Sequence, residues 1–226
     1  LVFDLNNKLY HSNNYKKANQ GHLPASTYKI PNSIIGLETA VISKNEIFKW
    51  NGEKRYLPAW EKDLNLKQAF QFSCVPCYQE VARNIGVDAM NDYLIKLDYG
   101  TMEVNTKTLD NFWLGGNSKI SPLQQIDFLK RFYLKELPIS ESTYQVMKDI
   151  LQINISDNYI LSGKTGWSIS NKIDNGWFVG FLETNKNVYF FATNIEPNKS
   201  FNMDLFANIR KSITMEALKS LEVVKQ

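Results

Sequence analysis

The chain has 226 residues, of which 43% are hydrophobic, so it can bury a sizeable core and form one large domain or two small ones. Its 26 lysines and arginines stand against 23 aspartates and glutamates without any basic block, and the net charge is +3. This balance argues against a nucleic-acid or membrane-surface partner, and no apolar run approaches the roughly 20 residues that span a bilayer.

The chain opens with a predicted hairpin. Apolar and polar residues alternate around Asn6-Asn7, which predicts strands over residues 1–5 and 8–11. A polar loop over residues 13–25 follows. An apolar run at helical spacing then predicts a helix from Ser26 to about Ile42.

The middle of the chain is predicted to be mostly helical. Residues 43–65 combine aromatic and turn-forming residues, which indicates an irregular connection. Five stretches after this connection carry apolar residues at helical spacing. They are residues 66–72, 77–85, 87–97, 122–134 and 142–151.

The last third of the chain changes to strands and one helix. The predicted strands cover residues 159–161, 176–184 and 188–194, and a helix over 203–221 closes the chain. Strands at both ends with helices between them predict an α+β fold, in which the two ends share one antiparallel sheet flanked by helices and the middle forms a mostly helical lobe. We expect a single domain over residues 1–226.

The first chemical signal lies at the start of the predicted helix after the polar loop. Ser26 and Lys29 are three residues apart, so their hydroxyl and amine share one helix face. A serine becomes a good nucleophile when a base takes its proton, and a lysine buried enough to lose its charge can be that base. The same spacing also suits a helix-capping serine and a solvated lysine, so the pair needs support from other motifs.

Two further motifs follow in chain order. Ser73-Cys74-Val75 stands at a break between two predicted helices, where a serine can cap a helix or relay a proton to the first serine. Lys164-Thr165-Gly166 follows a predicted strand and is either an ordinary turn or part of a sheet edge. At such an edge an extended substrate can lie along the backbone while the ammonium group faces its carboxylate.

The only cysteines, Cys74 and Cys77, form a C-x-x-C pattern. This pattern can be a redox pair, half of a metal site or two small core residues. A second ligand pair is missing, and His11 and His22 are not at metal-ligand spacing, so we expect no metal ion. We favour two small core residues, with a disulfide as the main alternative.

Together the motifs S-x-x-K, S-x-V and K-T-G stand in the order used by serine β-lactamases and penicillin-binding proteins. Val75, where many of those proteins carry a polar residue, resembles the class D β-lactamases, or oxacillinases. Further matching pieces are Leu23–Asn32, Ile35–Glu38, Leu97–Gly100, Phe112–Leu114 and Val188–Ala192. The resemblance covers nearly the whole chain and implies the serine β-lactamase and penicillin-binding transpeptidase-like fold.

The resemblance implies a chemical role for each matching residue. Ser26 would be the acylated nucleophile. Lys29 would be the general base after N-carboxylation by carbon dioxide or bicarbonate, and no other cofactor is implied. Ser73 would relay protons, Trp113 would donate its indole N–H to the carbamate, and Lys164 would face the substrate carboxylate.

The resemblance also implies which residues hold the substrate. Thr165 and Arg210 would join Lys164 in facing the carboxylate, and the backbone N–H groups of Ser26 and Trp167 would form the oxyanion hole. The other expected lining residues are Val75, Tyr99, Leu114 and Gly166. At Thr101 the chain departs from the Tyr-Gly-Asn that the family usually carries, and a threonine lacks the amide donor of an asparagine.

A carbamate can form only on an unprotonated amine, whereas a lysine in water has a pKa of about 10.4. We expect apolar walls made by Phe72, Val75, Trp113 and Leu114 to disfavour the ammonium form and so to lower the pKa of the lysine. The same base would activate the serine for ring opening and then a water molecule for hydrolysis of the acyl-enzyme.

The resemblance therefore implies an enzyme that hydrolyses the β-lactam ring of penicillin-type antibiotics and so gives antibiotic resistance, in the periplasm or as a secreted protein. One alternative is the β-lactam-sensing domain of a membrane-bound receptor, which would acylate the same serine and release it slowly. Another is a peptidoglycan transpeptidase, which normally carries a polar residue in place of Val75. The motifs do not specify the oligomeric state or the preference among penicillins, cephalosporins and carbapenems.

Overall fold

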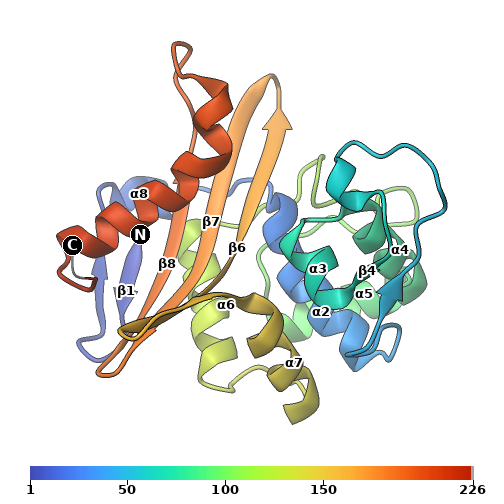
Figure 1. The fold of residues 1–226 in the computed structure, drawn as a ribbon, viewed down its shortest axis with the longest axis horizontal. Coiled ribbons are helices and arrows are strands. Elements are labelled where there is room, and N and C mark those ends of the chain that lie inside the picture. Colours follow the sequence, from blue (N-terminus) through green and yellow to red (C-terminus); the bar gives the residue numbers. More distant parts are fainter. Residues whose placement is uncertain (225–226) are drawn as a thin grey trace.

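A computed structural model describes residues 1–224. A six-stranded antiparallel sheet, in the strand order β2-β1-β8-β7-β6-β5, forms one side of the molecule, and most of the helices form the other (Figure 1). The strands are β1 Val2–Asp4, β2 Leu9–His11, β5 Gln152–Ile155, β6 Tyr159–Ser170, β7 Ile173–Thr184 and β8 Val188–Ile195. The sheet thus joins the two ends of the chain, as the sequence predicts.

The helices lie mainly between the two sequence segments that build the sheet. They are α1 Tyr15–Ala18, α2 Lys29–Glu38, α3 Leu66–Gln71, α4 Val75–Ile85, α5 Val87–Leu97, α6 Pro122–Tyr133, α7 Glu141–Leu151 and α8 Phe206–Ser220. Short 3₁₀ helices cover Ala25–Tyr28, Pro58–Trp60 and Met203–Leu205, and β3 Ile47–Phe48 pairs with β4 Leu64–Asn65. No helix within residues 1–224 is both long and apolar enough to cross a membrane.

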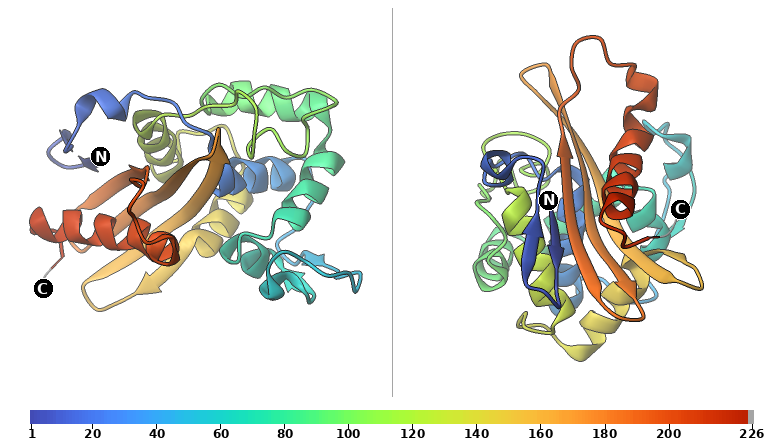
Figure 2. Two further views of the ribbon diagram at one scale, coloured as in Figure 1. Left: turned by 90° about the horizontal axis from the view of Figure 1, so that it is seen from above. Right: turned by 90° about the vertical axis from the view of Figure 1, so that its left-hand side faces the viewer.

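Side chains along each strand point alternately to the two faces of the sheet, and both faces are covered by other parts of the chain. In β7, Trp177, Val179 and Phe181 belong to the main core, which is shared with the helical lobe. Phe178 and Leu182 belong to a second cluster with Leu218 of α8. Figure 2 shows α8 on one face of the sheet and α6 on the opposite face. This two-sided burial makes the sheet a rigid wall for the site.

The structure shifts several predicted boundaries. The helix predicted over 26–42 is a 3₁₀ turn followed by α2, which ends at Glu38, and the polar loop over 13–25 contains α1. The strand predicted over 159–161 is only the beginning of β6, and β5 was not predicted. Periodicity missed the rest of β6 because residues 162–166 are Ser-Gly-Lys-Thr-Gly, a segment with no apolar side chain to alternate with polar ones.

Candidate active site

Ser26 and Lys29 lie at the junction between the 3₁₀ helix Ala25–Tyr28 and α2. The Lys29 Nζ atom lies 3.2 Å from the Ser26 Oγ atom. Ala25 has a positive φ of 49°, and its N–H donates to the Trp113 carbonyl at 2.9 Å, so the turn that presents the serine is held by a distant loop. The prediction that the Ser26 hydroxyl and the Lys29 amine lie side by side is therefore confirmed.

The Lys29 side chain is completely buried, with 0% of its surface exposed. Burial disfavours the ammonium form and lowers the pKa of Lys29 to about 7. The Nζ atom lies 5.0 Å from the centroid of the Tyr78 ring. In the part of the chain that the structure describes, Lys29 makes no ion pair, so a large fraction of the amine is neutral near pH 7.

The wall around this amine differs in part from the expected one. Phe72 is 39% exposed and is not a buried wall, whereas Tyr78 of α4 is fully buried under the amine. Sequence reasoning missed Tyr78, although it stands one turn of α4 after Val75. Val75 and Leu114 are partly buried and pack against the main core.

Trp113 is fully buried and stacks on Tyr28, with ring centroids 5.3 Å apart. Within residues 1–224, its indole Nε1–H has no hydrogen-bond acceptor. A buried N–H without an acceptor costs about 1–3 kcal/mol, so this group is suited to an anion placed against it. The structure thus offers a free donor on the residue from which the sequence expects one.

Ser73 lies between α3 and α4 and has a positive φ of 55°. The helix cap is Cys74, whose sulfur accepts the Cys77 N–H, so the alternative in which Ser73 caps α4 is excluded. The Ser73 hydroxyl instead accepts a hydrogen bond from the Lys164 Nζ atom at 2.5 Å. This contact joins two motifs that are 91 residues apart.

Lys164, Thr165 and Gly166 lie inside the long strand β6 and not in a turn. Strand β5 pairs only with the first part of β6, around Ile160 to Ser162. Among the described residues no strand pairs with β6 on that side beyond Ser162, so the expected sheet edge is present at the motif. A Cβ atom on Gly166 would lie 3.1 Å from the Pro24 carbonyl and 3.3 Å from the Thr27 N atom. The glycine therefore lets β6 lie close to the turn that carries Ser26.

Lys164 is the second buried lysine of the site and is 3% exposed. Burial is the main cause that brings the pKa of Lys164 well below its usual value, and the nearby charges of Lys29, Arg210 and Lys211 lower it further. Besides Ser73, its amine contacts the Thr165 carbonyl at 3.0 Å. Arg210 and Lys211 place positive charge beside this amine, an arrangement that favours an anionic substrate.

Arg210 of α8 reaches the same strand. Its guanidinium donates to the Gly166 carbonyl at 2.6 Å and to the Ala207 carbonyl at 2.8 Å. It also lies 5.8 Å from the Trp167 ring, which is 40% exposed. The structure thus brings Arg210 and Trp167 beside the Lys164-Thr165-Gly166 segment.

Tyr99 is not positioned as expected. It is 1% exposed, and its hydroxyl lies 3.4 Å from both the Thr27 hydroxyl and the Gln125 side-chain oxygen. The expectation that Tyr99 lines the substrate pocket is wrong for this structure, because the ring packs between Tyr28 and Phe128. Gln125, which the sequence did not single out, also donates to the Thr27 hydroxyl at 2.9 Å and so supports the residue next to Ser26.

Thr101 acts through its backbone. It forms an isolated antiparallel bridge with Lys119, with N–H to carbonyl distances of 2.8 and 2.7 Å. Gly100 before it has a φ of 61°, and a Cβ atom there would lie 2.6 Å from the Lys119 carbonyl. Since the contact is made by the main chain, the change from the family's asparagine leaves it intact.

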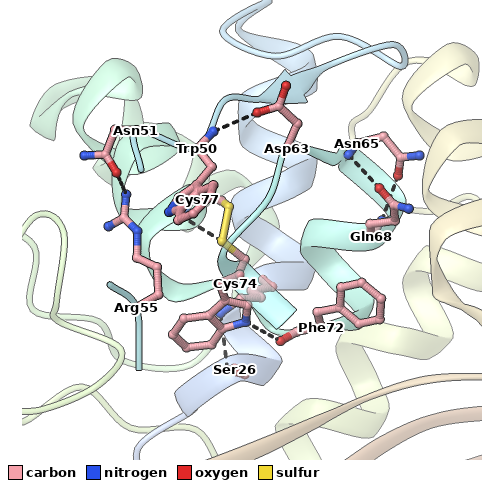
Figure 3. Close-up of a disulfide and its surroundings, with 12 residues drawn as sticks. Ser26, Trp50, Asn51, Arg55, Asp63, Asn65, Gln68, Phe72, Cys74 and Cys77 are labelled. Carbon is pink, nitrogen blue, oxygen red and sulfur yellow. Dashed lines mark hydrogen bonds between the residues drawn. A yellow bond between two sulfur atoms is a disulfide. The ribbon is translucent and has the colours of Figure 1, made fainter. Parts of the chain in front are cut away.

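Cys74 and Cys77 form a disulfide, which corrects our preference for two separate core residues (Figure 3). Their Cα atoms are 5.4 Å apart because they occupy the N-cap and the third residue of α4. This distance lies within the range that a disulfide spans. Both residues are buried, as a core position requires, so burial alone did not distinguish the two possibilities.

The residues of the site come from elements far apart in the chain. Comparison of the whole chain with known proteins shows which family it resembles. Residues 3–215 match the family described as the penicillin-binding protein transpeptidase domain. The chain is 38% identical over 225 residues to the β-lactamase OXA-48 of Klebsiella pneumoniae, covering 99% of this chain and 83% of that protein. It is 44% identical to a class D β-lactamase structure from Nostoc, with a TM-score of 0.93 and coverage of 99% of this chain and 92% of that one.

A regulatory protein is also similar. The chain is 35% identical over 201 residues to the regulatory protein BlaR1 of Bacillus licheniformis, which covers 88% of this chain but only 33% of that protein.

Proposed function

The chain belongs to the class D β-lactamases, and we propose that it hydrolyses the β-lactam ring of penicillin-type antibiotics through an acyl-enzyme on Ser26. The observation that carries this proposal is the fully buried Lys29, whose pKa is about 7 and whose amine lies 3.2 Å from the Ser26 hydroxyl. A neutral amine at this position has a lone pair available for chemistry, whereas an ordinary lysine at neutral pH does not.

The lysine also fits the carboxylated form that the family relationship suggests. A carbamate on Lys29 would be held by the Ser26 hydroxyl and by the Trp113 indole N–H, which has no acceptor among the residues that the structure describes. This group supplies a general base for the serine and, after acylation, for a water molecule. The burial that lowers the pKa of Lys29 keeps part of the amine unprotonated at neutral pH, and only an unprotonated amine can react with carbon dioxide.

Other residues of the site are suited to stabilising the oxyanion and to protonating the leaving nitrogen. The backbone N–H groups of Ser26 and Trp167 are our candidates for the oxyanion hole, because Gly166 brings their two segments together. The Ser73 hydroxyl, bound to Lys164, can pass a proton to the leaving nitrogen of the opened ring. Protonation lets that nitrogen leave as a neutral amine and not as an anion.

The substrate carboxylate is expected to face β6 and α8. Lys164, Thr165 and Arg210 surround this edge, and cations this close favour binding of an anion. The partly buried Val75 and Leu114 are suited to an apolar cover over the base, which limits the entry of water to the site.

We also propose that the protein acts in the periplasm or outside the cell. Disulfides persist mainly in oxidising compartments, and the pair Cys74–Cys77 is buried at the site. Detection of the protein in the periplasmic or culture-medium fraction of its native cells tests this, and a purely cytosolic protein would contradict it.

The decisive experiment follows the lifetime of the acylated serine. Intact-protein mass spectrometry after mixing with excess benzylpenicillin is expected to show a transient mass increase, which returns to the free enzyme as substrate is consumed. Ser26→Ala should show neither the adduct nor turnover of a chromogenic β-lactam. An adduct stable for hours in bicarbonate buffer would instead identify a sensor of the BlaR1 kind, and turnover by folded Ser26→Ala would refute the proposal.

A further inference from the structure

A cavity of about 390 Å³ opens onto the disulfide Cys74–Cys77. Its wall includes Trp50, Arg55 and Lys62 besides the two cysteines. Figure 3 shows Arg55 and Asn51 on one side of the disulfide, and both residues line the cavity with the two cysteines. A molecule in this cavity would therefore be in contact with the disulfide.

The cavity is positively charged. Its lining includes four cationic side chains and one carboxylate, namely Lys49, Arg55, Lys62, Arg83 and Glu80. Lys49 and Arg83 form ion pairs with Asp63 and Asp110. Over residues 1–224, neither the Arg55 guanidinium nor the Lys62 amine forms an ion pair with a carboxylate, and the guanidinium donates to the Asn51 side-chain oxygen at 2.9 Å. These two cations raise the local concentration of small anions.

The two sulfurs are not equivalent. Cys77 is 8% exposed and Cys74 is 2% exposed, so Cys77 is the more accessible target. Cys74 is the N-cap of the 11-residue helix α4, and its sulfur already accepts the Cys77 backbone N–H at 3.3 Å. A helix N-terminus lowers the pKa of a thiol, and a thiol of lower pKa leaves faster in disulfide exchange.

We propose that Cys74–Cys77 is a thiol–disulfide exchange site that reacts with small anionic thiols bound in the basic cavity. A thiolate attacks the Cys77 sulfur, the bond between the two protein sulfurs breaks, and the electron pair leaves on Cys74. A second thiolate then attacks the sulfur that the first one brought, which releases Cys77 as a thiolate and forms the disulfide of the small molecule. The protein gains two electrons, two small thiols are oxidised, and solvent protonates the cysteines according to their pKa values.

The test compares three thiols of similar size and different charge on the wild-type protein: 2-mercaptoethanesulfonate, 2-mercaptoethanol and cysteamine. Each is used at the same thiolate concentration in low salt, and the reaction is stopped with iodoacetamide. Intact mass then counts the chains that carry two alkyl labels. We expect the anionic thiol to reduce the disulfide about fivefold or more faster than the neutral one, and the cationic thiol to be slowest. In high salt the three rates should converge.

Two double variants show whether the preference for the anionic thiol arises in the cavity. Arg55→Gln/Lys62→Gln should lose the preference for the anionic thiol and keep the rate with the neutral one. Lys186→Gln/Lys199→Gln removes the same charge from exposed positions outside the cavity and should keep the preference. Equal rates for the three thiols, or two labels on untreated protein, would overturn the proposal. Because the readout is chain mass, it is independent of β-lactam hydrolysis.

Discussion

The two sides of the site each bury a lysine, but the surroundings make the two amines different. On the helical side, burial alone lowers the pKa of Lys29, and within residues 1–224 its amine donates one hydrogen bond, to the Ser26 hydroxyl. On the sheet side, Lys164 is bound to Ser73 and to the Thr165 carbonyl and lies near the positive charges of Arg210 and Lys211. The first side therefore provides a reactive neutral group, and the second provides a cluster of donors and charge for holding a substrate.

This difference explains why one lysine cannot replace the other. An amine that serves as a base, or that binds carbon dioxide, must have a free lone pair, and apolar burial provides that. A group that binds a carboxylate needs positive charge nearby, and Arg210 can supply it even where Lys164 is discharged. The predictions below separate these two tasks.

The largest effect is expected from Lys29→Ala. Loss of the base should lower kcat for a chromogenic β-lactam by about 10³-fold or more, because general base catalysis typically contributes 10²–10⁴-fold and both steps use it. Acylation should become slow, and the acyl-enzyme should then persist in intact-mass measurements. Lys44→Ala, at an exposed position outside the site, is the matched control. A variant that hydrolyses substrate at near the wild-type rate would show that Lys29 is only a core residue.

Removal of the indole donor is expected to be the next largest effect. Trp113→Phe keeps an aromatic ring against Tyr28 but loses the N–H, so a carbamate would lose a hydrogen bond. We expect kcat to fall by about 10-fold or more, corresponding to the 1.5–3 kcal/mol of a hydrogen bond to a charged group, with partial recovery in added bicarbonate. Trp177→Phe is the control, because its buried N–H donates to the Leu23 carbonyl. The same bicarbonate dependence in wild type and Trp113→Phe would contradict a role for this donor.

The pH dependence should follow the helical-side lysine. Burial disfavours the ammonium form of Lys29 and sets its pKa to about 7, so the amine is neutral above this pH and protonated below it. Activity should therefore rise from acid to neutral pH, by roughly tenfold between pH 6 and pH 8, and should depend on bicarbonate at the acid end. A pH–rate profile for kcat with and without bicarbonate measures this. A rate that is constant from pH 5 to 8 and independent of bicarbonate would refute the assignment.

A smaller effect, confined to binding, is expected on the sheet side. Arg210→Ala should raise KM for a carboxylate-bearing β-lactam about tenfold, equivalent to about 1.4 kcal/mol, and change kcat by less than about threefold. Lys219→Ala, near the end of the same helix and paired with Glu216, is the control. A fall in kcat at constant KM would instead place Arg210 in the chemical step.

The smallest effect is expected at the disulfide. Cys74→Ser/Cys77→Ala keeps a capping oxygen at the start of α4 and removes a cross-link that closes a loop of only a few residues. Chain entropy then predicts a loss of about 2 kcal/mol, or a fall of about 4–8 °C in Tm, and activity should stay within about twofold. Calorimetry and initial rates check both values. Loss of activity in the folded variant would show that the cross-link is essential, against our expectation.

Local patterns in the sequence were sufficient for much of the fold. The spacing of apolar residues predicted α5 with its observed bounds, Val87–Leu97, and placed strands over residues 176–184 and 188–194, where β7 and β8 lie. Helical and strand periodicities are local properties, so they can be read without knowing what packs against each element. The order of the three motifs likewise identified the serine, the lysine and the K-T-G segment before their positions in space were known.

Tertiary structure alone decided how these pieces meet. The contact between Ser73 and Lys164 joins positions 91 residues apart, and no local pattern specifies such a distance. Tyr78 under Lys29 and Gln125 beside Thr27 looked like ordinary helix residues, while Tyr99 matched a family motif but is buried. The sequence specifies which faces of the helices and strands are apolar. Long-range packing decides which partner each face meets, and it therefore also decides which amine is shielded from water.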